Sequence, residues 1–163
     1  MNALGVVVAD TTPLNYLIII GRAEILASLF AEVLIPVAVL EELRHPKAPE
    51  AISQWFREPP AWLRISPVQH VDETIQLGKG ENEAISLAIE RQVKVLLIDE
   101  RLGRGAAQAR GLIPVGTLNL IDLADEKGLL DGVSALDDLR KTTFRADSEL
   151  LGRFEARMKA RQG

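Results

Sequence analysis

The sequence contains no cysteine, only two histidines and no long apolar run. Without cysteine, the chain forms no disulfide and offers no thiolate as a metal ligand or nucleophile. Its apolar stretches are far shorter than the roughly 20 residues that span a membrane, and no signal-like segment opens the chain. We therefore expect a cytoplasmic protein that does not enter a membrane.

Positive charge is also in short supply. The chain has 19 Lys and Arg against 23 Asp and Glu, which gives a formal net charge of −4. Proteins that bind nucleic acid usually carry an excess of basic residues. If the substrate is a nucleic acid, local basic patches and metal ions must offset the negative field of this chain.

What the sequence does contain is the material for one domain with a substantial core. Its 163 residues are 47% hydrophobic and 26% charged, without low-complexity tracts. The clearest strand is the β-branched run at 6–8, followed by Asp10. A run without polar alternation is typical of a strand covered on both faces, as in parallel sheets. We expect Thr11 or Thr12 to cap the following helix and Pro13 to be its first residue.

Strand-like and helix-like segments alternate along the rest of the chain. Apolar patterns predict further strands at 32–35, 62–65, 93–98 and 111–116. They predict helices at 14–20, 23–30, 37–44, 49–57, 81–89, 101–109, 118–126, 133–141 and 148–160. This alternation predicts an α/β fold with a mostly parallel sheet of four to five strands.

Acidic residues stand at the ends of strands or near the starts of helices. Asp10 and Asp99 each follow a strong strand. Adjacent helical residues differ by about 100° in direction, so only one of Glu41 and Glu42 faces a given strand end. We favour Glu42 and keep Glu41 as the alternative.

The helix at 81–89 offers a second pair of acids, Glu81 and Glu83, in its first turn. Favourable interaction with the helix dipole is a structural explanation for acids at this position. Asp10 has a similar one, since aspartate often caps helices. Four carboxylates at one sheet edge would repel each other strongly, however, unless a cation held them.

The types of side chain that are available as metal ligands limit which cation the chain could hold. Both His45 and His70 are isolated in turn-like contexts, and we expect them at the surface. Oxygen ligands alone suit the hard ions Mg²⁺ and Mn²⁺. Such ions activate water and stabilise the leaving oxygen in phosphodiester hydrolysis. The pattern therefore points to a metal-dependent nuclease.

Four segments in this order resemble the PIN-domain nucleases. They are VADTTPL at 8–14, IPVAVLEEL at 35–43, GENEAISLA at 80–88 and LIDE at 97–100. The resemblance implies a three-layer α/β/α fold, with residues 1–130 as the catalytic part and 131–163 as a helical extension of the same domain. It also implies cleavage of single-stranded RNA, frequent homodimers and, in prokaryotes, pairing of a toxin with an antitoxin protein.

The resemblance assigns roles to individual residues. Asp10, Glu42, Glu81 and Asp99 look like the ligands of Mg²⁺ or Mn²⁺, with Glu41 and Glu83 as alternatives, and Thr12 looks like a supporting hydroxyl. Glu81 stands where the family often has aspartate, so its carboxylate has a longer reach. We further expect Lys79, Arg101 and Arg104 to contact RNA phosphates, because they flank the acidic helix starts.

Two other interpretations compete with the nuclease. One is a catalytically weak PIN-like module that binds RNA or protein and keeps its acids as caps and surface charge. The other is a phosphoacceptor switch, which requires a lysine near the end of the last strand, and residues 113–117 contain none. The apolar residues of 133–163 form a stripe that we predict to face a dimer or antitoxin partner, and packing back onto the domain itself is the alternative. At such an interface the basic rim would consist of Arg153, Arg157, Lys159 and Arg161.

Overall fold

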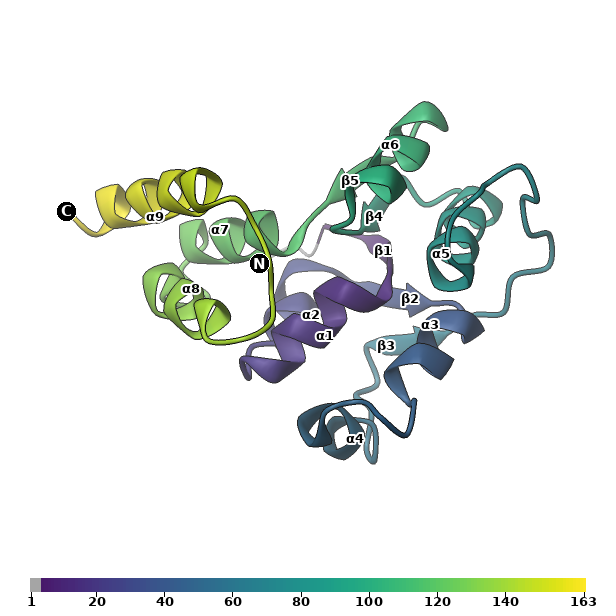
Figure 1. Ribbon diagram of the computed structural model, residues 1–163, viewed down its shortest axis with the longest axis horizontal. Coiled ribbons are helices and arrows are strands. Elements are labelled where there is room, and N and C mark those ends of the chain that lie inside the picture. The colour runs from purple at the N-terminus through teal and green to yellow at the C-terminus, as the bar shows by residue number, and fades with distance from the viewer. Residues whose placement is uncertain (1–3) are drawn as a thin grey trace.

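Five short apolar segments pair into one sheet in the computed structural model, which describes residues 4–163 (Figure 1). Neighbouring strands are all parallel, in the order β3-β2-β1-β4-β5. The strands are β1 (Val6–Ala9), β2 (Glu32–Ile35), β3 (Leu63–Ile65), β4 (Val95–Leu97) and β5 (Ile113–Val115). The predicted parallel α/β fold is confirmed, although β4 and β5 are shorter than the apolar runs that contain them.

Helices cover both faces of the sheet. They are α1 (Thr11–Ile19), α2 (Ile25–Leu29), α3 (Val37–Leu43), α4 (Glu50–Trp55), α5 (Lys79–Glu90), α6 (Arg101–Ala109), α7 (Thr117–Glu126), α8 (Gly132–Arg140) and α9 (Ser148–Gln162). Figure 1 shows α7, α8 and α9 together on one side of the sheet and α5 on the other. Among the helices of residues 4–163, none has the length and apolar character needed to cross a membrane.

The alternation of side chains along β1 separates two hydrophobic cores. Val7 and Ala9 belong to the larger core, which α1, α2, α4 and α7 to α9 also supply. Val8 belongs to the smaller core, formed with α5 and α6. The helix α3 buries Val39 in the larger core and also packs against α5. This three-layer arrangement fixes α3 and α5 beside the carboxyl ends of the central strands.

Two helices begin earlier than the sequence suggested, α1 by two residues and α7 by one. Asp10 is the N-cap residue of α1, and Pro13 lies inside the first turn, where its missing N–H would have no helical partner. Gly116 is the N-cap residue of α7, and Thr117 is its first helical residue. In both places a threonine hydroxyl lies inside the first turn of the helix and not at the cap, which leaves it available for other contacts.

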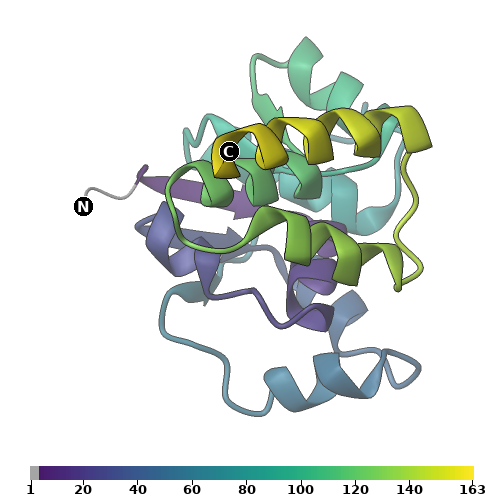
Figure 2. The same ribbon diagram turned by 90° about the vertical axis from the view of Figure 1, so that its left-hand side faces the viewer.

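The C-terminal helices pack onto their own domain, so the prediction that their apolar stripe faces a partner is wrong. Leu136 and Leu139 of α8 and Phe154 and Met158 of α9 are buried in the larger core. Figure 2 shows α9 lying across α7 and α8. Two arginines expected at a partner interface instead pair with α7: Arg157 lies 2.8 Å from Asp122, and Arg161 lies 2.9 Å from Asp125.

We predict that truncating Met158 destabilises the whole domain. Met158 is 0% exposed, and Met158→Ala should lower the free energy of unfolding by about 2–5 kcal/mol, because it removes buried contacts and leaves a cavity. Arg153→Ala is the matched control, since Arg153 is exposed on the same helix and should change stability by less than about 0.5 kcal/mol. Urea denaturation measures both. Equal, small effects would show that α9 is dispensable for the core.

Candidate functional site

The central pair of strands brings two aspartates to one edge of the sheet. Val8 and Ala9 of β1 pair with Leu96 and Leu97 of β4, and the N–H of Asp10 donates to the carbonyl of Leu97 at 2.8 Å. Asp10 is only 5% exposed. Its side chain makes no capping hydrogen bond to α1, although the N–H of Thr11 is near enough to favour the charged carboxylate.

The helices α3 and α5 add two glutamates to this edge. The hydroxyl of Thr11 donates to Oε2 of Glu42 at 2.5 Å. Glu42 also lies against Gly80, where a side-chain carbon would collide with its carboxylate. Glu81 repels both Asp10 and Glu42 electrostatically, which places its carboxylate in the same cluster. The structure thus brings Asp10, Glu42, Glu81 and Asp99 within electrostatic reach of one another.

The two alternative glutamates have other partners. Glu41 is exposed and lies 3.8 Å from Lys79, in a surface ion pair. Oε1 of Glu83 accepts a hydrogen bond from the backbone N–H of Ala38 at 3.1 Å, which satisfies a free donor at the start of α3. Glu42, and not Glu41, therefore lies in the acidic cluster. Glu81 lies there too, whereas Glu83 joins α5 to α3.

Asp99 is held by a residue that the sequence did not single out. Thr117 donates its backbone N–H to Oδ1 of Asp99 at 2.7 Å and its hydroxyl to Oδ2 at 2.6 Å. Thr117 is fully buried, and Gly116 before it leaves room for the carboxylate, since a side-chain carbon there would lie 2.9 Å from Oδ1. A Gly-Thr pair directly after the last strand is the sequence signal that could have indicated this role.

The two threonines in the first turn of α1 differ in their contacts with the acidic cluster, and Thr12 was the one predicted to support it. Within residues 4–163, Thr11 provides the hydrogen bond from α1 to an acid of the cluster, whereas Thr12 is half-buried in the same turn. A supporting role for Thr12 stays a prediction. Both histidines are exposed, as predicted.

Burial raises the pKa values of Asp10, Glu81 and Asp99, and repulsion from neighbouring acids adds to the effect at Asp10 and Glu81. The pKa of Asp10 is raised to about 7, mainly because burial removes water from the carboxylate; the N–H of Thr11 opposes this, and Glu81, Glu42 and Asp99 add to it. Burial also raises the pKa of Glu81, followed by repulsion from Glu100, a neighbour that the sequence analysis overlooked. For Asp99, burial raises the pKa against the hydrogen bonds from Thr117 and the charge of Arg104.

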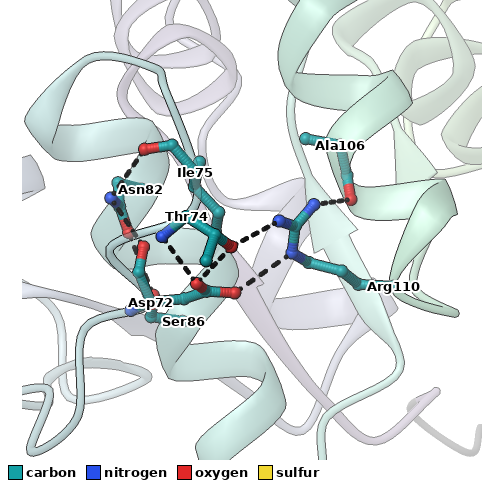
Figure 3. Close-up of polar contacts among 7 residues, drawn as sticks. All are labelled: Asp72, Thr74, Ile75, Asn82, Ser86, Ala106 and Arg110. Atoms are coloured by element: carbon teal, nitrogen blue, oxygen red, sulfur yellow. Dashed lines mark hydrogen bonds and ion pairs between the residues drawn. The ribbon is translucent and has the colours of Figure 1, made fainter.

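A long loop fixes the start of α5, where Glu81 lies (Figure 3). The side-chain amide of Asn82 donates to the carbonyls of Asp72 and Ile75, at 3.1 and 3.3 Å. The carboxylate of Asp72 accepts from Thr74 and from Arg110 just after α6. This network ties α5 to the end of α6 through residues 72–75 and so positions Glu81.

The three basic residues that were predicted to contact phosphate lie in two separate regions of the structure. Arg101 and Arg104 of α6 line a cleft of about 740 Å³ that reaches Asp99. Arg104 also donates to the carbonyl of Ile98 at 3.3 Å. Lys79 lies apart from this cleft, at the start of α5, in its ion pair with Glu41.

The combination of a parallel sheet with acids gathered at its carboxyl edge can be compared with known families. A family model described as a PIN domain matches residues 6–160. The chain belongs to the PIN-domain family. No curated protein sequence matches the chain. PIN domains are generally nucleases that use divalent metals, so the match supports a nuclease-type function. The match includes α8 and most of α9, in agreement with their packing on the core.

The acids of this PIN domain form a cluster and not a preformed ion site. Within residues 4–163, no three Asp, Glu or His side chains are arranged so that they could hold a metal ion. The donor set nevertheless fits a hard divalent cation, because every ligand is an oxygen and Oε2 of Glu81 is buried without a hydrogen-bond partner. Binding an ion would require carboxylates such as Glu42 and Glu81 to turn.

We predict that two glycines of α6 respond oppositely to alanine. At Gly103 a side-chain carbon would lie 2.6 Å from Cδ1 of the buried Ile98 and 2.8 Å from Oε2 of Glu81. Gly103→Ala should therefore cost about 1–3 kcal/mol of unfolding free energy. At Gly105 no atom lies within 4 Å, so Gly105→Ala should stabilise the helix by about 0.5–1 kcal/mol. Chemical denaturation compares them, and equal stabilisation would contradict the packing of Glu81 against α6.

The raised pKa of Asp10 predicts that the metal-free protein loses stability as pH rises. The folded pKa of about 7 exceeds the ordinary 3.8, so the contribution is complete below pH 3.8 and is lost as pH rises through 7. Asp10→Asn should abolish this loss and, at pH 8, raise the free energy of unfolding by up to about 4 kcal/mol.

Denaturation in EDTA at pH 5 and pH 8 tests this expectation. Asp137→Asn is the control, because Asp137 is exposed and should matter by less than about 0.5 kcal/mol. A loss of several kcal/mol in Asp10→Asn at pH 8 would instead make Asp10 a structural residue.

Proposed function

We propose that the protein is a metal-dependent endoribonuclease that cleaves phosphodiester bonds of single-stranded RNA with Mg²⁺ or Mn²⁺. The observation that carries the proposal is the cluster of four carboxylates from four separate segments, in which Glu81, Glu42 and Asp99 all act on Asp10 as negative charges. Such repulsion is costly unless a cation is bound. A purely structural role would favour acids paired with lysine or arginine, as Asp122 and Asp125 are.

The acids of the cluster and the residues around them have different roles in the proposed reaction. Asp10, Glu42, Glu81 and Asp99 would hold the ion, which when bound supplies an activated water and charge stabilisation at the leaving oxygen. Thr117 orients Asp99 through two hydrogen bonds, and Thr11 orients Glu42 through one. Such neighbouring hydrogen bonds commonly decide whether a ligand points at the metal. Arg104, beside Asp99, would contact a phosphate of the RNA.

The proposal also covers where the protein acts and which partners it binds. The motifs of this chain look like a poorly characterised prokaryotic branch of the family, and the family resemblance implies a cytoplasmic protein, frequent homodimers and, in prokaryotes, pairing of a toxin with an antitoxin. We propose an antitoxin protein and a second copy as the partners of this chain. A small gene for a DNA-binding protein beside the gene for this chain would support the pairing.

One observation favours a second candidate. Because no preformed ion site is present within residues 4–163, a PIN-like module that binds RNA or protein without cleaving it is the alternative function. Glu81, in place of the aspartate frequent in the family, also favours it. The two candidates differ in one measurable property, which is turnover of RNA in the presence of a divalent cation.

We predict that the purified protein cuts end-labelled single-stranded RNA with Mn²⁺ or Mg²⁺ and not with EDTA. Asp10→Asn and Asp99→Asn should each reduce the rate by roughly 100-fold or more, because each removes an ion ligand. The neighbouring glutamates form a matched pair: Glu42→Gln should lose activity, whereas Glu41→Gln, in a surface ion pair, should retain it. RNA that is bound but never cut with either ion would decide for the binding module.

A further inference from the structure

The cleft beside Asp99 is larger than an ion site requires. Its volume of about 740 Å³ lies in the range of pockets that take small organic ligands, roughly 300–1,000 Å³. Its lining includes Asp99, which belongs to the proposed catalytic cluster, and the neighbouring Arg104. It also includes residues of the connector 141–147 and Leu150 and Phe154 of α9. The cleft therefore joins the acids to the C-terminal part of the domain.

The course of the chain explains why the connector reaches the acids. The helix α7 starts at the carboxyl edge of the sheet and runs away from it, because Thr117 at its first residue binds Asp99. The helix α8 packs against α7 and carries the chain back, so the connector 141–147 returns to this edge before α9 begins (Figure 2). The end of α8 thus delivers Phe144 and Arg145 to the cleft.

The connector is held in a defined conformation. The hydroxyl of Thr142 donates to the carbonyl of Leu139 at 2.6 Å and accepts from the N–H of Phe144 at 3.1 Å. The ring of Phe144 packs edge-to-face on Tyr16 of α1, with centroids 5.1 Å apart, and the Tyr16 hydroxyl bonds that of Thr143 at 2.8 Å. Phe144 is therefore fixed relative to α1, the helix that begins at Asp10.

The charge of the cleft is positive at its rim, although the chain as a whole is acidic. Arg101, Arg104 and Arg145 all line it, and Arg101 and Arg145 are exposed. Within residues 4–163, Arg101 and Arg145 form no ion pair with a carboxylate, unlike Arg157 and Arg161 of the same domain. Free guanidinium groups on a rim attract phosphate, and an aromatic wall suits an unstacked base.

The cleft is also lined by polar amides. Asn119 of α7 and Gln108 of α6 are both exposed and both line it. Side-chain amides form paired hydrogen bonds with the edges of bases. The apolar side chains, the amides and the arginines of the cleft match, in this order, the face of a base, its edge and the phosphate of a nucleotide.

We infer that this cleft binds one nucleotide of the single-stranded RNA next to the scissile phosphate, with Phe144 and Arg145 contacting its base. The inference rests on the proposed function, because it takes the substrate to be RNA cut beside Asp99. It makes the connector 141–147 the element that selects the base, and it gives α8 and α9 a role in substrate choice in addition to their packing.

Binding and cleavage are measured separately, so that this inference and the proposed function fail in different ways. In EDTA, the anisotropy of a fluorescent single-stranded RNA reports affinity without turnover. Arg145→Ala should weaken binding roughly tenfold and lower the salt slope by about one. Arg153→Ala, which removes the same charge from an exposed site outside the cleft, should change affinity less than about twofold.

With Mn²⁺, sequencing the ends of a cleaved random RNA pool gives the base preference. In Arg145→Ala and Phe144→Leu the preference should flatten at one position beside the cut and persist elsewhere. Wild-type cleavage with unchanged preference and affinity in both variants would overturn the subsite and leave the nuclease standing. If the wild-type protein does not cleave RNA, the proposed nuclease function is wrong. The anisotropy measurements in EDTA would then still test the nucleotide subsite. Loss of dimerisation in Arg145→Ala with unaltered RNA affinity would make the cleft a protein interface and overturn the inference.

Discussion

Repulsion among neighbouring carboxylates is the constraint around which this domain is built. Asp10, Glu42, Glu81 and Asp99 meet at one edge of the sheet, and removal from water already raises the pKa values of Asp10, Glu81 and Asp99. The fold tolerates them by giving most of them a partner of their own. Thr117 binds Asp99, Thr11 binds Glu42, and Arg104 adds positive charge near Asp99. Asp10 has the least support, which is why its pKa departs furthest toward neutrality.

Space is the second part of the same solution. Gly80, Gly103 and Gly116 belong to three different segments, and each faces one carboxylate of the cluster at a distance that excludes a side chain. Gly80 makes room for Glu42, Gly103 for Glu81 and Gly116 for Asp99. These glycines have ordinary helical or extended backbone angles, so their role is to admit an acid and not to form a turn.

Much of this arrangement follows from patterns that a single sequence displays. The apolar runs before Asp10 and Asp99 predicted two buried strands, and parallel pairing then places both acids at the same edge. Helix geometry also predicted that only one of Glu41 and Glu42 faces this edge, and the contacts with Thr11 and Lys79 show that it is Glu42. Thr117 did not follow, because the same residue type at the same place is common as a helix cap, and only the packing of β4 beside β5 brings it to Asp99.

The C-terminal stripe was misjudged for a related reason. An amphipathic pattern shows that a helix buries one face, and it does not show against what. The deciding contacts lie on α7, whose Asp122 and Asp125 receive Arg157 and Arg161. In the sequence alone, Asp122 and Asp125 look like ordinary polar positions. Their role becomes visible only when α9 is placed beside α7. The overlooked Glu100 is similar, since its effect on Glu81 depends on how α5 meets the end of β4.

The pairing of β1 with β4 has a consequence for synthesis of the chain. Val8 pairs with Leu96, and both hydrogen bonds from Thr117 to Asp99 come from a residue still later in the chain. Contacts that join such distant residues form late, because a long loop must close first. When only the first half of the chain has been synthesised, the strands β1, β2 and β3 are present, but β4, Asp99 and Thr117 are not. The cell meets the assembled cluster only when synthesis is nearly complete.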